Sequence, residues 1–162
     1  MSTPARMSEI SIRAARSEDI PAIARLLEQL ARRHITFEFS PSVEEKFLKS
    51  NDEASINTFI ANGFRYWVAE RDSEIVGFAG VRDHSHLYHL FVAEHAQRQG
   101  IARRLWQTAM HCCRAAGNSG RFTVNSSNTA VAVYESFGFV RSGPRQNADG
   151  VLFNPMALED AG

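Results

Sequence analysis

The segment Gln97-Arg98-Gln99-Gly100-Ile101-Ala102 separates two stretches of different pattern. The apolar run 86–92 before it is typical of a strand, and the amphipathic run 103–110 after it is typical of a helix. A turn that contains a glycine and opens a helix leaves several backbone N–H groups without partners. Those donors, the helix dipole and the nearby arginines favour a bound phosphate or pyrophosphate. The segment therefore predicts a site for a phosphorylated cofactor.

The composition excludes several classes of partner. The 162 residues suffice for one compact domain, and 44% hydrophobic and 22% charged residues are ordinary values for a globular protein. Eighteen Lys and Arg residues balance 18 Asp and Glu residues. This balance gives no general attraction to nucleic acid or to an anionic membrane, so we expect neither partner.

The cysteines and the N-terminal segment bear on the organisation of the chain. Cys112 and Cys113 are adjacent and cannot cross-link distant parts of a fold, so we expect reduced thiols. Residues 1–9 lack the apolar stretch of a signal peptide, and we expect them to form a flexible leader. Residues 10–160 are then expected to form a single domain, with a cytoplasmic location.

The remaining pattern predicts an α/β fold with one mixed sheet flanked by helices. Strands are expected at residues 10–13, 64–69, 75–81, 86–92, 121–124, 139–141 and 151–158. Helices are expected at about 18–33 after a Ser17 cap, from a Ser42 cap onward, as a turn near 56–60, at about 98–117, and at 129–137 after Ser127 or Asn128.

Two motifs carry a resemblance to a known family. The turn resembles the pattern Gln/Arg-x-x-Gly-x-Gly/Ala, with Gln97, Gly100 and Ala102 at the set positions. The later stretch 130–139 resembles Ala-x-x-x-Tyr-x-x-x-Gly-Phe, with Tyr134 as its tyrosine. Together with the order of elements from Ile10 onward, the motifs resemble the GNAT acyltransferase superfamily.

The resemblance implies a fold and a cofactor. The implied fold is a single, mostly antiparallel mixed sheet whose central parallel strands, 86–92 and 121–125, splay apart. Acetyl-coenzyme A (acetyl-CoA) would lie between these strands, with its pantetheine arm on the first and its pyrophosphate on the turn. The implied cofactor-binding residues are Leu90, Phe91, Val92, Gln97, Arg98, Gln99, Gly100, Ile101, Ala102, Arg103 and Asn128.

Two points of cofactor contact stay open at the level of sequence. The family often has an asparagine seven residues before the helix tyrosine, and here Ser127 occupies that position between Asn125 and Asn128. The arginines of the turn region either form a solvated basic face or neutralise phosphates, with Arg103 or Arg104 using its side chain.

The resemblance and elementary acid–base chemistry indicate Tyr134 as the catalytic acid. A phenol with a pKa near ~10 is protonated at neutral pH and can donate a proton to a departing thiolate. The alternative is a core tyrosine that packs beside Phe137 and Phe139.

Three histidines are candidates for the base that deprotonates the amine, because imidazole titrates near neutral pH. His86 and His84 share a strand parity that His89 does not, and some family members carry a base at the position of His86. We place His86 first, with a purely structural role or a water chain as alternatives. No third ligand accompanies the histidine pair at a recognisable spacing, so no metal site is expected.

These features predict an N-acetyltransferase that uses direct attack of a primary amine on acetyl-CoA in a ternary complex. A small-molecule or peptide amine would bind near loop 34–40, the first two helices and the connection 143–150. Phe37, Glu38 and Phe39 would line that pocket, with Glu38 pairing to the amine, or would serve only as loop. We expect a monomer or a homodimer.

The class of acceptor is open among amino acids, polyamines, aminoglycosides, peptide N-termini and protein lysines. The alternative function is an acyl-CoA-binding sensor or interaction module without efficient catalysis. A different nucleotide-binding domain is disfavoured, because the chain contains neither Gly-x-Gly-x-x-Gly nor Gly-Lys-Ser/Thr.

Overall fold

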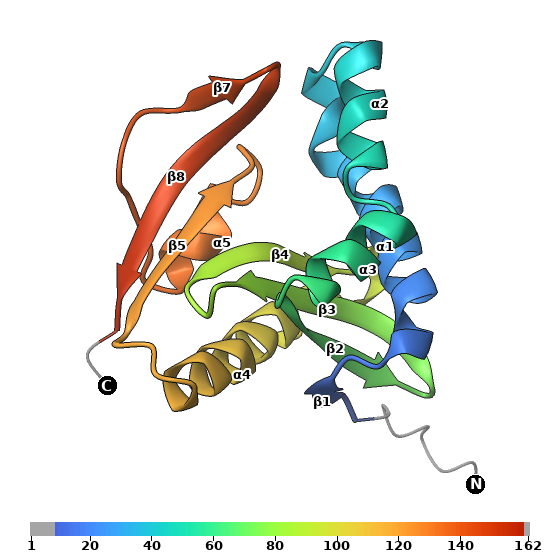
Figure 1. Cartoon of the computed structure of the whole chain (residues 1–162), viewed down its shortest axis with the longest axis vertical. Helices are drawn as coiled ribbons and strands as arrows, with labels where there is room; N and C mark the ends of the chain where they lie inside the picture. Colours follow the sequence, from blue (N-terminus) through green and yellow to red (C-terminus); the bar gives the residue numbers. More distant parts are fainter. Residues whose placement is uncertain (1–8, 161–162) are drawn as a thin grey trace, which may run out of the picture.

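The computed structural model describes residues 9–160, which form one mixed sheet with helices on both faces (Figure 1). The predicted leader lies outside the described residues except for Glu9. The strands are β1 Ser11–Ala14, β2 Arg65–Arg71, β3 Glu74–Arg82, β4 His86–Val92, β5 Arg121–Ser126, β6 Val140–Arg141, β7 Gln146–Ala148 and β8 Val151–Glu159. The helices are α1 Ile20–His34, α2 Pro41–Lys49, α3 Glu53–Ala61, α4 Ile101–Ala115 and α5 Val131–Ser136, with 3₁₀ turns at Ser17–Asp19, Thr36–Glu38 and Glu94–Ala96.

The sheet splits at its centre, as the resemblance implies. Its strand order is β1-β2-β3-β4-β5-β8-β6, with β7 paired to β8, and every pair is antiparallel except β4 with β5. That parallel pair joins only His86 to Thr123 and Leu87 to Val124. Figure 1 shows β5 and β8 rising away from the rest of the sheet beyond this point. From Tyr88 onward, the β5-facing edge of β4 therefore lacks a strand partner.

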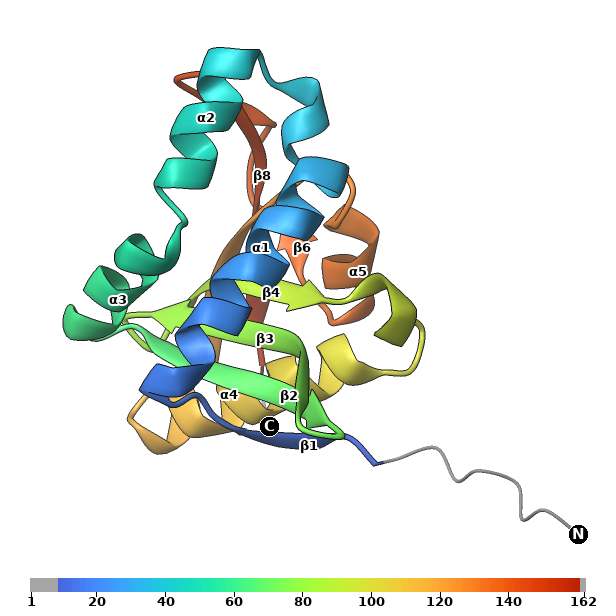
Figure 2. The ribbon, with the colours of Figure 1, turned by 90° about the vertical axis from the view of Figure 1, so that its right-hand side faces the viewer.

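Helices on the two faces of the sheet bury two hydrophobic cores (Figure 2). Trp67 and Ala69 of β2 pack on the α4 side, whereas Tyr66 and Val68 pack on the side of α1 and α3. Because both faces are covered, β2 and β3 are continuous apolar runs and not alternating ones.

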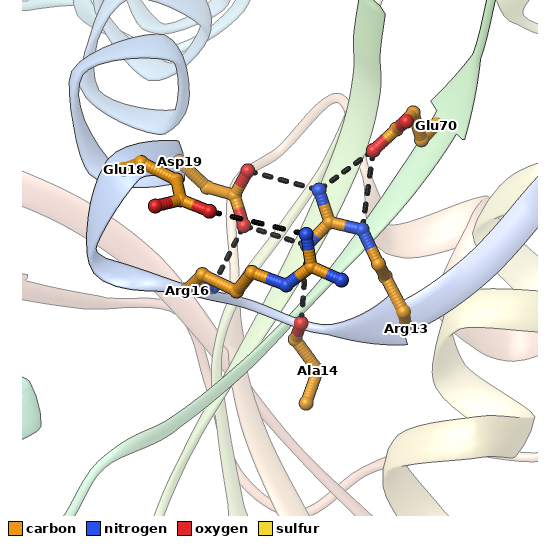
Figure 3. A network of polar contacts seen from close by, with 6 residues as sticks. All are labelled: Arg13, Ala14, Arg16, Glu18, Asp19 and Glu70. Atoms are coloured by element: carbon orange, nitrogen blue, oxygen red, sulfur yellow. Dashed lines mark hydrogen bonds and ion pairs between the residues drawn. The ribbon is translucent and has the colours of Figure 1, made fainter. Parts of the chain in front are cut away.

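An ion-paired arginine joins the first strand to its neighbours (Figure 3). The Arg13 guanidinium donates to Asp19 at 2.7 Å and to Glu70 at 2.6 Å. These bonds lower the pKa of Asp19, which also accepts the Arg16 N–H at 2.7 Å. The network fixes β1, the start of α1 and β2 relative to one another.

A β-bulge in β4 changes which side chains face the same way. Gly80 pairs with His89 and Val81 pairs with Leu87, so Tyr88 has no partner in the β3 register. One extra residue reverses the alternation beyond it. The rings of Tyr88 and His89 consequently lie 4.6 Å apart, and that of His86 lies 6.4 Å from Tyr88. The prediction that His86 and His89 point to opposite faces is therefore wrong.

Several predicted helix starts are also corrected. A 3₁₀ turn begins at Ser17, and the N-cap of α1 is Asp19. Helix α2 is capped by Ser40, whose hydroxyl accepts the Val43 N–H, because Pro41 occupies the first helical position. Helix α5 begins at Val131 after Ala130, so neither predicted cap is used.

Two elements were incompletely predicted from the sequence. The helical turn expected near 56–60 is the full helix α3, capped by Asp52, whose side chain accepts the Ser55 N–H. The strand β7 was not predicted, because all three residues of Gln146–Ala148 are exposed and carry no apolar alternation. None of the helices described in residues 9–160 is both long and apolar enough to cross a membrane.

Candidate active site

The glycine turn presents a row of free backbone donors. Gly100 has φ 76° and is the N-cap of α4, which begins at Ile101 and not at Arg98 as predicted. The first helix-type hydrogen bond runs from the Arg104 N–H to the Gly100 oxygen at 3.1 Å. Within residues 9–160, none of the N–H groups from Arg98 to Arg103 donates a hydrogen bond. Six consecutive donors at a helix N-terminus suit a pyrophosphate.

The side chains of the turn have different roles. Gln97 donates from Nε2 to the Val92 oxygen at 3.0 Å and so ties the turn to the end of β4. The Gln99 side chain accepts from Arg71 at 3.0 Å and does not line the cavity described below. The Gln99 side chain is therefore not supported as a cofactor contact in that cavity.

The predicted arginines separate into two groups. Arg98 and Arg103 line the cavity, and Arg103 also reaches α5, where it donates to the Ser136 oxygen at 3.1 Å and stacks over Phe137 at 5.0 Å. Arg104 donates instead to the Ile10 oxygen at 3.1 Å, outside that cavity. Arg104 is thereby removed as a side-chain phosphate ligand.

A cavity of about 1090 Å³ occupies the split between β4 and β5. This volume lies slightly above the range of about 300–1,000 Å³ that is common for ligand sites. The cavity brings together most of the predicted site residues: His86, Leu90, Phe91, Val92, Gln97, Arg98, Gly100, Ile101, Ala102, Arg103 and Tyr134.

Asn128 is not part of the cavity wall, and its prediction as a cofactor contact is not supported. Its Nδ2 donates to Glu38 at 2.9 Å, and its Oδ1 accepts from Asn154 at 2.8 Å. Both ends of the amide are thus engaged by protein groups. Its neighbours Asn125 and Ser127 do line the cavity.

Tyr134 lies in α5 and is 7% exposed. Phe137 and Phe139 contact its ring edge-on, with centroids 6.3 Å and 5.7 Å away. Its hydroxyl makes no hydrogen bond to any described residue, and the residue lines the cavity. Burial raises the pKa of Tyr134, so the phenol stays protonated at neutral pH.

His86, the first candidate for the base, lines the cavity, as does His89. Its Nδ1 shares a hydrogen bond of 2.7 Å with Thr123 Oγ1, while Nε2 bonds to no described residue. Burial lowers the pKa of His86 to about 4, so its imidazole is neutral at pH 7. His84 is exposed, has φ 54° in the turn before β4 and does not line the cavity, so the parity argument does not apply to it.

Comparison with known proteins identifies the family. The profile described as "Acetyltransferase (GNAT) domain" matches residues 27–160. The chain belongs to the GNAT acetyltransferase family. Enzymes of this family use acetyl-CoA as co-substrate. The match to the GNAT domain also fits the sheet that splits between β4 and β5.

Curated relatives and solved structures agree with this assignment. Human N-acetyltransferase 8 is 34% identical over 92 residues, which are 50% of this chain and 40% of the relative. The probable N-acetyltransferase camello of Xenopus laevis is 34% identical over 85 residues, 48% of this chain and 39% of that protein. The matches thus span less than half of each relative.

Two solved structures are similar in fold to this GNAT domain. PaiA N-acetyltransferase of Thermoplasma acidophilum, solved with coenzyme A, has a TM-score of 0.77 at 16% identity and covers 94% of this chain and 99% of its own. YncA of Salmonella typhimurium, solved with acetyl-CoA, has a TM-score of 0.68 at 18% identity, with 96% of both chains covered.

A buried neutral network forms part of the cavity wall of this GNAT domain, because His89 and Asn51 both line the cavity. His89 bonds through Nε2 to Asn51 Oδ1 at 2.8 Å and through Nδ1 to the Tyr66 hydroxyl at 2.9 Å. Asn51 Nδ2 donates to the Phe47 oxygen at 2.8 Å, so its Oδ1 is an acceptor and His89 carries its proton on Nε2. Burial lowers the pKa of His89 to about 3. His89 is therefore a structural link between β4 and the end of α2, not a base.

The opposite side of the cavity from β4 is formed by α2 and the β7–β8 hairpin, and we call it the α2–hairpin wall. Its members are Val43, Lys46, Phe47, Ser50, Ala148, Asp149, Val151, Leu152 and Phe153. The two elements touch, because a Cβ built on Gly150 would lie 2.6 Å from Val43 Cγ2. Figure 1 shows both elements at the end of the molecule away from α4.

The loop residues predicted to line an acceptor pocket do not reach the cavity wall. Phe37 is 59% exposed, and Glu38 is bonded to Asn128. Neither residue lines the cavity, and Phe39 packs edge-on against Phe47 instead. This part of the loop forms the short 3₁₀ turn Thr36–Glu38, and the loop composition does not reveal that these three residues lie outside the cavity wall.

Proposed function

We propose that this chain is an N-acetyltransferase that transfers an acetyl group from acetyl-CoA to a primary amine by direct attack in a ternary complex. One observation carries the proposal: Tyr134, His86 and the turn residues Arg98 and Gly100–Arg103, whose N–H groups are free, all line the same cavity. Membership of the GNAT family supports it. We also propose that residues 10–160 act as one catalytic domain.

The wall of the cavity fits coenzyme A in two respects. A pyrophosphate would accept hydrogen bonds from the free amides of the turn, with Arg98 and Arg103 nearby to balance its charge. The unpaired edge of β4 at Leu90–Val92 would bind an extended amide-containing arm as a strand binds its neighbour. The β4–β5 split provides the room between the strands.

The acid–base chemistry follows from the two predicted catalytic residues. Acetyl-CoA supplies a thioester whose carbon–sulfur bond breaks as the amine nitrogen bonds to the acetyl carbon. The amine loses a proton during the attack. Neutral His86 accepts this proton on its own Nε2, directly or through a water. Tyr134 donates its proton to the departing sulfur, and exchange with solvent then returns both side chains to their starting states.

The experiment that tests the function combines a binding assay with a turnover assay. Acetyl-CoA should raise the melting temperature of the protein, whereas NAD and ATP should not. Release of free thiol should then depend on an added amine, with intersecting lines in initial-velocity plots. Binding without amine-dependent thiol release would favour a sensor, and parallel lines would contradict the ternary complex.

A further inference from the structure

The α2–hairpin wall is mostly apolar. Helix α2 contributes Val43 and Phe47, and strand β8 contributes Val151, Leu152 and Phe153. Tyr88 of β4 borders the same space, beside the rings of Phe59 and Phe64. A wall of this composition removes apolar surface from water and therefore favours a ligand with a bulky apolar group.

The α2–hairpin wall also carries one cationic side chain, that of Lys46. Lys46 follows Val43 by three residues on α2, so both lie on the face of the helix that borders the cavity. Lys46 is exposed, and its ammonium makes no hydrogen bond or ion pair with any residue in the described part of the chain. Its ammonium is therefore free to bind a ligand in the cavity.

The only carboxylate of the α2–hairpin wall, within residues 9–160, is that of Asp149. Asp149 lies at the tip of the β7–β8 hairpin, has φ 52° and is exposed. Glu38, the carboxylate expected to bind a cationic amine, is bonded to Asn128 outside the cavity. The wall thus offers a polycation one exposed carboxylate and the repulsion of Lys46, which is poor complementarity.

We infer that the acceptor is an amine that also carries a carboxylate and a bulky apolar side chain, with Lys46 binding the carboxylate. The chemical class is that of apolar amino acids. This inference rests on the proposed acetyl transfer and chooses among acceptors for it. The Lys46 ammonium would bind the carboxylate through a charge-assisted hydrogen bond, while the apolar side chain of the acceptor packs on the wall.

The test compares three acceptors in the thiol-release assay: L-phenylalanine, phenethylamine and spermidine. Phenethylamine keeps the ring and the amine of phenylalanine but lacks its carboxylate. Wild-type protein should show the highest kcat/KM with phenylalanine and the lowest with spermidine. Lys46→Met should lower kcat/KM for phenylalanine roughly tenfold more than for phenethylamine. Each loss is the ratio of kcat/KM in wild type to kcat/KM in Lys46→Met for the same amine. The intrinsic reactivity of that amine therefore cancels.

Lys49→Met is the matched control, because Lys49 lies on the same helix, is exposed and does not line the cavity. It should leave the selectivity between the two amines unchanged. Lys46→Glu should move the preference toward spermidine, because it replaces repulsion of a polycation with attraction.

Each outcome separates this inference from the proposed function. A wild-type preference for phenethylamine or spermidine, or an equal loss for both amines in Lys46→Met, would overturn the inference and leave acetyl transfer intact. Absence of amine-dependent thiol release with all three acceptors would overturn both.

Discussion

The two sides of the cavity are built in different ways. The glycine turn, Gln97–Arg103, is one contiguous segment whose donors are backbone N–H groups. The α2–hairpin wall joins Val43 to Gly150, which are far apart in the sequence, and its chemistry is that of side chains. A local backbone motif can thus form one part of a cavity wall, while the rest of the wall depends on how distant elements pack.

The electrostatics of the two sides differ as well. The turn combines free N–H groups with two arginines at a helix N-terminus. The β4 bulge and the α2–hairpin wall combine apolar side chains with histidines that burial keeps neutral. Reaction would take place where these two environments meet, near Tyr134 and His86.

The largest expected effect is on the acid between the two sides. Tyr134→Phe removes the hydroxyl but keeps the ring that packs against Phe137 and Phe139. We expect kcat to fall by about 10²–10³-fold, because a general acid contributes on that order. Acetyl-CoA binding, measured by calorimetry, should change less than about twofold. Unchanged turnover across pH would remove Tyr134 from the mechanism.

The next effect concerns the base. His86→Gln should lower kcat/KM for the amine by about 10²-fold, with His84→Gln, which is exposed and outside the cavity, as its control. Because the pKa of His86 is about 4, wild-type activity should fall as the pH drops through that value and the base becomes protonated. A glutamine variant that retains this acid limb would show that another group is the base.

The glycine turn can be broken without touching the α2–hairpin wall. Gly100→Ala forces a side chain into φ 76°, so the free N–H groups should lose their common direction and acetyl-CoA affinity should fall about tenfold. Gly117→Ala is a matched control at the other end of α4, with φ 110° and equally open space. Both variants should lose about 1–2 kcal/mol of stability. Equal acetyl-CoA affinities would contradict the role of the turn.

The smallest effect is on stability and tests the neutral histidines. The unfolded state binds protons near a pKa of 6.5, whereas folded His86 does so near 4. Between these values the unfolded state holds more protons, so the free energy of unfolding falls as the pH drops from 6.5 toward 4. The free energy of unfolding can be measured by urea titration at pH 7 and at pH 5. Between these two pH values it should fall by about 1–2 kcal/mol more in wild type than in His86→Gln. Equal losses would show that His86 is not held neutral.

The sequence predicted the glycine turn because its signal is local, whereas the split sheet was implied by the resemblance to the GNAT superfamily. Gly100 between an apolar run and an amphipathic run is enough to indicate free amides at a helix start. Tyr134 stands in a short motif, and His86 in a strand whose ends were predicted correctly. These residues could therefore be named before any contact was known.

Other parts of the site gave no signal that a single sequence can reveal. The bulge at Tyr88 depends on the register of β4 against β3, and it decides which histidines share a face. Nothing in the sequence around Asn51 or Tyr66 indicates that either residue bonds to His89, which lies between them in the fold. The position of Asn128 near the tyrosine motif predicts a cofactor contact, but in the fold its amide is bonded to Glu38 and Asn154.

The sequence alone determined the class of this protein, its candidate cofactor-binding turn and the identity of its candidate acid. Those features rest on backbone geometry and on motifs of neighbouring residues, which the order of amino acids encodes directly. The tertiary structure alone decided that His89 is structural, that Arg104 and Asn128 face away from the cavity, and that Lys46 stands on its apolar wall. Those features depend on burial and on contacts between segments distant in the chain, which form only when the chain packs.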